Sequence, residues 1–479
     1  MLSDDVLYLT VRELGERIRA KQISPVELTE SYLDRSQKVG PQLNAYVTLT
    51  HDLALAQAKQ AEAEIAGGNY RGPLHGIPYA AKDLLAVKGY KTTWGARAFH
   101  DQAFDYDATV IEKLNAAGAI LIGKAAMIEL AGGMGYRYAS ASLTGPAKNP
   151  WNTAYWTGGS SSGPGAIVSA ALAAFAIGTE TWGSIVCPSA FCGVTGLRPT
   201  FGRVSRHGAM ACAYSLDKIG PMARSAEDCA LVLAAIAGHD PLDRSSLPEN
   251  EAAFAYPPPE PKPRRTTHAA QPAPTTPLRI GWLTNAWQKP NAEVASLTRA
   301  AVELLQRNGM RLADAKLPDG PYEAATGTIL SAENAAAFRK FLVEGRAVDL
   351  TDPLGRIGGY VHQQVSADDY MLALQIRAIF QERVDKLFDD FDVIAAPSLP
   401  VPATRLDANI ETDLAFPDPL GGIGNLCGLP AISVPCGFAA ANLPVGLQFL
   451  ARVRYDRVLV AIASLFQQHT QWHQQRPSI

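Results

Sequence analysis

Residues 149–197 read NPWNTAYWTGGSSSGPGAIVSAALAAFAIGTETWGSIVCPSAFCGVTGL. Glu180 is the only charged side chain in this stretch, which indicates that the stretch lies in the interior of the protein. Its apolar part, residues 166–178, is interrupted by Ser169 and is too short to cross a membrane. The stretch also holds six serines, several of them beside glycines. Buried hydroxyls need hydrogen-bond partners, so this cluster indicates either a helix cap or a functional site.

Helix and strand patterns alternate on both sides of this stretch. The sequence Ser24-Pro25-Val26-Glu27 is typical of a capping box with proline at the first helical position. The pattern predicts helices over 25–39, 50–66, 108–117, 293–308 and 458–474, and strands over 76–81, 119–123, 278–282, 392–397 and 431–434. This repeated change of period favours an α/β fold in which helices are layered on a sheet.

A proline-rich segment interrupts the pattern at residues 248–277. It contains nine prolines and no glycine, so we expect an exposed loop that buries little surface and is partly polyproline II. Its Pro258, Glu260 and Pro261 could recruit a proline-reading domain, but a tolerated surface insertion is the more common case.

Composition excludes several classes of function. The 43 basic and 46 acidic residues give a net charge of −3, so nothing in the charge balance favours nucleic-acid binding. The six cysteines show no CxxC and no Cys/His metal spacing, which predicts buried free thiols in a reducing cytoplasm and no metal site. Residues 1–20 contain no apolar core of a secretory signal. A length of 479 residues alone gives a prior of about three domains.

The residues alone leave the chemistry open. No HExxH or GxSxG motif is present, and His75 and His207 are more simply explained as structural histidines. The glycine-rich loop at 158–165 lacks the GK[ST] ending of a phosphate-binding loop. A serine nucleophile without histidine needs another base, and a buried lysine with a lowered pKa can serve. Lys82 follows an apolar run, although an ordinary lysine at the end of a strand, exposed to water, is the commoner case.

Several long motifs in a fixed order resemble the amidase signature family. They are Gly158-Gly-Ser-Ser161, Gly178-Thr-Glu-Thr-Trp-Gly-Ser-Ile185, Cys192-Gly-Val-Thr-Gly-Leu-Arg-Pro-Thr200, Phe201-Gly-Arg-Val-Ser-Arg206, Ser215-Leu-Asp-Lys-Ile-Gly-Pro221, His75-Gly-Ile-Pro-Tyr-Ala-Ala-Lys-Asp83 and Leu429-Pro-Ala-Ile-Ser-Val-Pro435. The resemblance covers nearly the whole chain. It is strongest over 73–240 and absent from the proline-rich insertion.

The resemblance implies one amidase domain over residues 1–479, an α/β/α sandwich around a large mixed sheet. It also implies a Ser–cis-Ser–Lys triad, which falls on Lys82, Ser160 and Ser184, with a cis peptide bond at Gly159–Ser160. The two serines are 24 residues apart, as in the family's signature, so no insertion separates them. In this mechanism Ser184 attacks a carbonyl carbon, and Ser160 and neutral Lys82 move its proton.

The same resemblance assigns the surroundings of the triad. The backbone N–H groups of Thr181, Trp182, Gly183 and Ser184 are implied to form the oxyanion hole. The segment from Met127 through Gly132 and Gly133 to Met134 is implied to line the substrate pocket with its backbone and side chains. No metal and no cofactor are expected.

The chain departs from the family's usual residues near the nucleophile. Trp182 stands where glycine is common, Glu180 replaces aspartate, and Val186 replaces a common arginine. The tryptophan ring is expected either beside the oxyanion hole or packed into the core. Without that arginine, we expect Glu180 to lack an ion pair. It then needs backbone or hydroxyl partners or becomes protonated, because an unpaired buried charge is very costly.

These observations predict a cytoplasmic amidase that hydrolyses carboxylic amides through an acyl-enzyme. Esters, anilides and carbamates are plausible further substrates, and the expected partner is a small molecule rather than nucleic acid or a membrane, with the protein a monomer or homodimer. The alternative is the A subunit of a glutamine-dependent aminoacyl-tRNA amidotransferase, which shares the Ser24–Glu27 motif and the Gly-Arg-Val-Ser-Arg motif. A binding protein without activity is disfavoured because all three triad positions are kept.

Overall fold

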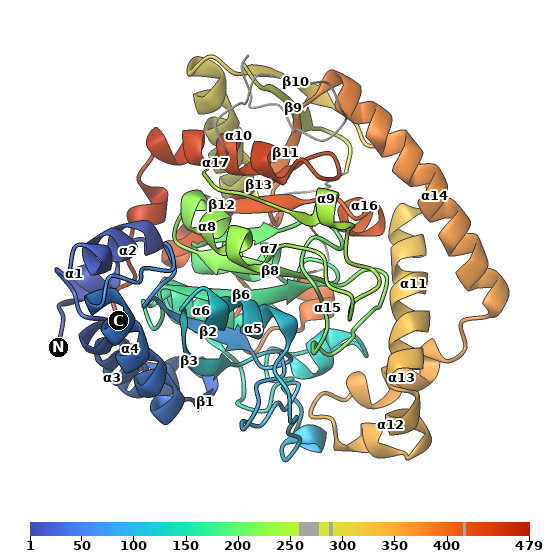
Figure 1. The fold of residues 1–479 in the computed structure, drawn as a ribbon. Coiled ribbons are helices and arrows are strands. Elements are labelled where there is room, and N and C mark those ends of the chain that lie inside the picture. The colour runs from blue at the N-terminus through green and yellow to red at the C-terminus, as the bar shows by residue number, and fades with distance from the viewer. Residues whose placement is uncertain (258–276, 287–290, 415–417) are drawn as a thin grey trace.

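Strands from nearly the whole length of the chain join one mixed sheet (Figure 1). The computed structural model describes residues 1–257, 277–286, 291–414 and 418–479. In spatial order, the strands described there are β1 (Tyr46–Leu49), β3 (Ile120–Ala125), β2 (Pro78–Lys82), β6 (Phe175–Glu180), β8 (Lys218–Ala223), β7 (Thr195–Arg198), β12 (Ala431–Ala439), β13 (Leu443–Leu450), β11 (Val393–Pro397), β9 (Arg279–Leu283) and β10 (Arg311–Ala315). A separate hairpin pairs β4 (Lys148–Asn149) with β5 (Asn152–Trp156).

The direction of the strands changes across the sheet. The strands β3, β2 and β6 are parallel to one another, as are β11, β9 and β10. The strands between these groups pair antiparallel, with β12 and β13 forming the longest ladder. The strand that ends at Lys82, β2, and the strand before the Ser184 loop, β6, are therefore direct parallel neighbours, and their carboxyl ends meet at one edge of the sheet.

Helices cover both faces of this sheet. Every residue of β2, β6 and β8 is buried, and strands buried on both faces need a layer of helices on each side. The longer helices are α2 (Val11–Arg19), α3 (Pro25–Leu43), α4 (His51–Ala66), α5 (Thr109–Ala116), α6 (Ser162–Ser169), α7 (Val186–Cys192), α8 (Ala226–Ile236), α10 (Ala292–Arg307), α11 (Tyr322–Ala337), α13 (Gly355–His362), α14 (Ala367–Asp390) and α17 (Asp456–Gln468). The shorter helices are α1 (Asp4–Leu7), α9 (Glu249–Ala252), α12 (Arg339–Val343), α15 (Ile410–Asp413) and α16 (Gly421–Leu426). The arrangement is the expected α/β/α sandwich.

The two largest hydrophobic clusters of the described residues lie between these layers. The larger one contains the inner residues of the sheet and the helices packed on it, including α3, α8 and α17. The smaller core lies among α11, α14 and α16, at the side of the sheet shown on the right in Figure 1. The functional site described below lies where β2 and β6 end, with α11 and α16 as a neighbouring wall.

Most predicted elements form within a few residues of their expected ends. Ser24 caps α3 by accepting hydrogen bonds from the backbone of Val26 and Glu27, and α3 runs four residues further than predicted. The prediction of one helix over 458–474 is wrong at its end, because α17 stops at Gln468 and a separate 3₁₀ turn follows at Trp472–Gln474. All six cysteines are free and buried, as predicted.

The proline-rich segment is only partly described. Its first residues do not form the expected exposed loop: they contain α9, and Ala252 and Phe254 are buried. Residues 258–276, including Pro258, Glu260 and Pro261, lie outside the described residues. The interpretation of this segment as a surface insertion therefore stays a prediction.

Candidate active site

Lys82 is the last residue of β2 and is completely buried. Its Nζ lies 2.8 Å from Ser160 Oγ, 3.0 Å from Ser161 Oγ and 2.9 Å from Thr179 Oγ1. The amine thus touches three hydroxyls, and within the described residues it forms no ion pair. The reading of Lys82 as an ordinary exposed lysine is wrong.

Burial changes the charge of this lysine. Removal from water lowers the pKa of Lys82 to about 7, and the more distant Cys212, Asp217 and Glu180 oppose this shift only in part. The hydroxyl of Ser161 also donates to the carbonyl oxygen of Thr179 at 3.1 Å. With its own hydrogen committed in this way, Ser161 is an acceptor toward the amine. The arrangement favours a neutral Lys82 whose lone pair is available to Ser160.

The glycine-rich loop between β5 and α6 presents Ser160 to the lysine. The Gly159–Ser160 peptide bond is cis, and the carbonyl oxygen of Ser160 accepts a hydrogen bond from the backbone of Ile128 at 3.2 Å. Ser160 is buried, as is the rest of the chain from Trp156 to Thr200 except for the half-buried Trp182. The prediction that the low-charge stretch lies in the interior is therefore confirmed, apart from residues 151–155 at its start.

Ser184 lies on the loop that joins β6 to α7. Its carbonyl oxygen accepts a hydrogen bond from the backbone N–H of Ser161 at 3.3 Å, which holds the two serine loops together. The structure therefore brings Lys82 and Ser160 into direct contact and places Ser184 on the adjoining loop. Among the described residues, no hydrogen bond joins the hydroxyls of Ser160 and Ser184.

The loop before Ser184 leaves backbone donors free. In the part of the chain that the structure describes, the N–H groups of Trp182, Gly183 and Ser184 have no hydrogen-bond partner. Gly183 has a φ of +83°, a conformation that glycine adopts at no steric cost. Free N–H groups beside a serine hydroxyl are suited to stabilise a developing oxyanion.

Comparison with known proteins identifies the family. Residues 27–460 match the family described as Amidase. The chain belongs to the amidase family, as the resemblance of its signature motifs predicted.

Individual relatives span the full length of the chain. The A subunit of glutamyl-tRNA(Gln) amidotransferase from Acinetobacter baumannii is 37% identical over 99% of both chains. Among solved structures, the native peptide amidase from Stenotrophomonas maltophilia is 29% identical, covers 98% of each chain and superposes with a TM-score of 0.83. The A subunit of glutamyl-tRNA(Gln) amidotransferase from Thermotoga maritima is 25% identical and gives a TM-score of 0.77, covering 100% of this chain and 98% of the other.

The expectation that Glu180 lacks an ion pair is wrong. Its Oε1 lies 2.5 Å from Nη1 of the buried Arg198, and Asn425 donates to the same oxygen at 3.1 Å. Its Oε2 accepts hydrogen bonds from the backbone of Ile185 and Val186. Burial alone raises the pKa of a carboxyl group, but Arg198 and these donors hold the pKa of Glu180 at about 2. Arg198 therefore supplies the positive charge that Val186 cannot.

Trp182 points toward the C-terminal half of the chain. Its indole passes so close to Gly421 in α16 that a Cβ there would lie 3.0 Å from Trp182 Nε1, and a Cβ on Gly327 in α11 would lie 3.9 Å from the ring. The side chain is half-buried, and its buried Nε1 has no hydrogen-bond partner among the described residues. The ring packs against two helices and is not enclosed in the core, so the expected placement inside the core is wrong.

The predicted substrate-binding segment lies close to the core. The side chains of Met127 and Met134 are buried in the larger hydrophobic core. Gly133 is buried as well and lies against Cys212 and Asn334, because a Cβ at this position would meet both side chains within 3 Å. The assignment of Met127, Gly132, Gly133 and Met134 to the substrate pocket stays a prediction.

Sequence reasoning missed several polar residues around the triad. Thr179 holds the lysine, Arg198 and Asn425 hold Glu180, and Asp217 accepts a hydrogen bond from the Thr181 hydroxyl at 2.6 Å. Thr179, Arg198 and Asp217 all lie inside motifs that carry the family resemblance, so their membership of these motifs could have indicated that they surround the site. Asn425 lies outside those motifs.

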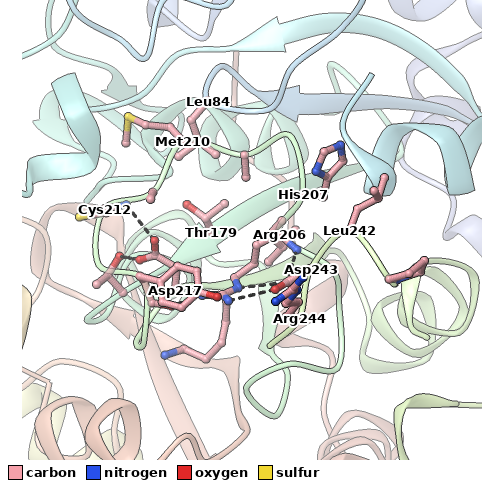
Figure 2. Close-up of a pocket in the computed structure, with 17 residues that line it drawn as sticks. Leu84, Thr179, Arg206, His207, Met210, Cys212, Asp217, Leu242, Asp243 and Arg244 are labelled. Atoms are coloured by element: carbon pink, nitrogen blue, oxygen red, sulfur yellow. Dashed lines mark hydrogen bonds and ion pairs between the residues drawn. The ribbon is translucent and has the colours of Figure 1, made fainter. Parts of the chain in front are cut away.

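A cavity of about 520 Å³ opens next to this network (Figure 2). Figure 2 shows Thr179 between Met210 and Asp217 in its wall, with the Arg206–Asp243 ion pair nearby. Thr179 and Thr181 line the cavity, whereas Ser160 and Ser184 are not among its described lining residues. The cavity therefore reaches Thr179, which contacts Lys82, and does not reach the two serines.

Two features are absent from the described ranges of the chain. No group of three or more His, Cys, Asp or Glu side chains there is arranged to hold a metal ion. No helix in the same ranges combines the length and the apolar character that crossing a membrane requires.

Proposed function

We propose that this amidase hydrolyses carboxylic amides through an acyl-enzyme, with Lys82 as base, Ser160 as proton relay and Ser184 as nucleophile. The observation that carries the proposal is the hydrogen bond between Ser160 and a fully buried Lys82 that has no carboxylate partner in the described residues. A neutral lysine is a competent base near pH 7, because general base catalysis is most efficient when the pKa of the base is close to the working pH.

The proposed reaction proceeds in two halves. Lys82 takes the proton of Ser160 as Ser160 takes the proton of Ser184, and Ser184 Oγ forms a bond to the carbonyl carbon. The C–N bond then breaks, and the relay returns the proton to the departing amine. Water repeats the sequence, breaks the ester bond to Ser184 and releases the carboxylic acid.

The proposed oxyanion hole consists of the backbone N–H groups of residues 181–184. Those of Trp182, Gly183 and Ser184 have no partner in the described structure and so remain available to a substrate oxygen. One such donor typically contributes about 3–4 kcal/mol to stabilising the transition state. Since this stabilisation acts on any tetrahedral intermediate, esters, anilides and carbamates are further candidate substrates.

Replacing Ser184 with alanine tests this proposal. We expect turnover of aryl amides to fall by about 10⁴-fold or more, since loss of a nucleophile leaves only binding and oxyanion stabilisation. Ser189→Ala is the matched control, because Ser189 is a buried serine five residues away whose hydroxyl has no partner. Equal amide turnover in the Ser184→Ala variant and the wild-type enzyme would show that the mechanism is wrong.

A second candidate function is the A subunit of a glutamine-dependent aminoacyl-tRNA amidotransferase. The curated relatives favour it, since the Acinetobacter baumannii subunit is 37% identical over 99% of both chains. The altered loop at 180–186 counts against this candidate, and the peptide amidase superposes with a higher TM-score than the Thermotoga maritima subunit. Assaying the purified chain with glutamine and with a panel of aryl and aliphatic amides separates the two. Glutamine hydrolysis that needs added partner subunits and tRNA supports the second candidate.

A further inference from the structure

The indole of Trp182 occupies space that the neighbouring helices leave open. Gly327 of α11 and Gly421 of α16 have no side chains, and the ring lies directly against both positions. Figure 1 shows α11 and α16 together at the side of the sheet drawn on the right. Removing the ring would therefore open a space between this loop and the two helices.

This space lies apart from the residues that contact Lys82. A departing amine must face the group that returns its proton, so it lies toward Ser160 and Lys82. The contacts of Lys82 are to Ser160, Ser161 and Thr179, whereas the contacts of Trp182 are to α11 and α16. The acyl chain, which stays bonded to Ser184, extends away from the relay and hence toward the indole.

Two carboxyl groups border the same space. A Cβ on Gly421 would lie 2.9 Å from Cβ and 3.1 Å from Cγ of Asp418, and Gly422 contacts the carboxylate of Glu323. Asp418 is 4% exposed, yet within the described residues its Oδ2 has no hydrogen-bond partner. The Oε2 of the half-buried Glu323 likewise has none there. Gln448 is fully buried and donates to Asp418, and its own Oε1 has no partner among the described residues. Acceptors left without donors beside the ring make this space favourable for a hydrogen-bond donor or a cation.

We propose that Trp182 determines the substrate specificity of this enzyme by closing the acyl subsite, so that the wild-type enzyme accepts short, uncharged acyl groups and excludes longer ones from the space bordered by Glu323 and Asp418. The inference rests on the proposed function, because it needs Ser184 to carry the acyl group. It adds to that function a limit on the length of the acyl group. It also adds a preference for acyl groups with a positively charged end, which should appear once the indole is removed.

The charge of the two carboxyl groups fits this reading. Burial and the nearby Asp418 raise the pKa of Glu323 to about 7, and burial and Glu180 raise the pKa of Asp418 to about 7. A cation that enters the space stabilises their ionised forms, whereas an apolar chain end does not. Charged acyl chains therefore gain more than neutral chains of equal length once the indole is removed.

The test compares p-nitrophenyl esters of acetate, pentanoate and 5-aminopentanoate on the wild-type protein, Trp182→Gly and Trp182→Phe. We expect the ratio of kcat/KM for pentanoyl over acetyl to rise at least tenfold in Trp182→Gly, since each methylene placed in an apolar pocket contributes about tenfold or more. Trp182→Phe keeps most of the ring and should stay within about threefold of the wild-type ratio. The 5-aminopentanoyl ester should gain more than the pentanoyl ester, and the added Glu323→Gln substitution should reduce that extra gain.

Intact-protein mass spectrometry of the acylated enzyme separates the two ways of failing. If no ester acylates Ser184 in the wild-type protein, the proposed function fails and the inference fails with it. If Ser184 is acylated but the length ratio is the same in the wild-type protein and Trp182→Gly, the inference alone is overturned. Trp182→Leu, which removes the ring but keeps an apolar side chain, carries the same comparison if Trp182→Gly does not fold.

Discussion

Lys82 and Lys124 lie one register position apart on the neighbouring parallel strands β2 and β3, and their surroundings differ. Both are completely buried, and Lys124 is the register partner of Ala81. Lys124 pairs with the carboxylate of Asp83 at 3.0 Å, whereas Lys82 contacts only oxygens of hydroxyls and one carbonyl. Burial lowers the pKa of both, but only Lys124 has a carboxylate in contact that opposes the shift. The contrast shows that the charge of the immediate neighbour, rather than burial, separates a structural lysine from a candidate base.

Among changes at the two lysines and their neighbours, the largest effect is expected from Lys82→Met. Removal of the base should lower kcat/KM for an aryl amide by about 10²–10⁴-fold, because general base catalysis contributes that much. Stability should change by only about 1–2 kcal/mol, the cost of leaving hydroxyls less well paired. Chemical denaturation together with steady-state kinetics measures both. A variant that keeps a tenth of wild-type activity contradicts the assigned role.

Lys124→Met should show the opposite pattern. Loss of the amine leaves the Asp83 carboxylate buried and unpaired, which typically costs about 3–5 kcal/mol of stability. Combining Lys124→Met with Asp83→Asn removes that charge and should recover much of the loss. The folded fraction should retain amide hydrolysis. If Lys124→Met unfolds at the same denaturant concentration as the wild-type protein, the ion pair contributes little to stability, and the structural role assigned to Lys124 is wrong.

The pH dependence of kcat/KM tests the charge of Lys82 directly. The lysine must be neutral to accept a proton, and its pKa is about 7. We therefore expect kcat/KM to rise about tenfold per pH unit below about pH 7 and to level off above it. Measuring hydrolysis of an uncharged amide from pH 5 to 9 checks this expectation. A rise that continues toward pH 10 would show that the amine keeps its ordinary pKa.

The smallest effect is expected from Thr179→Val. This change keeps the shape of the side chain and removes one acceptor from the amine. A hydrogen bond to the charged amine is about twice as strong as one to the neutral amine, so the midpoint of the pH profile should move lower. We expect about a tenfold loss of kcat/KM, in keeping with one lost hydrogen bond. Thr179→Ser keeps the hydroxyl and should restore both values; failure to do so points to a packing role.

The sequence predicts the scaffold of the site better than its polar contacts. Apolar runs and turn residues are local signals, so the strand before Lys82 and the helices around it are found within a few residues of their predicted ends. The low charge of residues 149–197 correctly predicts burial, because a long segment with a single charged side chain loses little by leaving water. The catalytic roles of Lys82, Ser160 and Ser184 came from the family resemblance and stay predictions.

The partners of Glu180 show why the remaining contacts were not foreseen. Arg198 lies on β7, which is separated from β6 by β8, and Asn425 lies 245 residues along the chain from Glu180. Such contacts depend on the order of strands in the sheet, which a local pattern does not encode. The direction of the Trp182 side chain was not foreseen for the same reason, because it depends on two glycines in helices distant in the sequence.

The ion pair between Glu180 and Arg198 also bears on how the protein matures. Arg198 donates to the carbonyl oxygen of Leu429, and Asn425 completes the surroundings of Glu180. A growing chain on the ribosome that has not reached these residues holds both serine loops but lacks the contacts that fix the buried charge beside them, as well as the central strands β12 and β13. We therefore expect a chain that ends before Asn425 to be inactive on amides, because the surroundings of Glu180 and the centre of the sheet are incomplete.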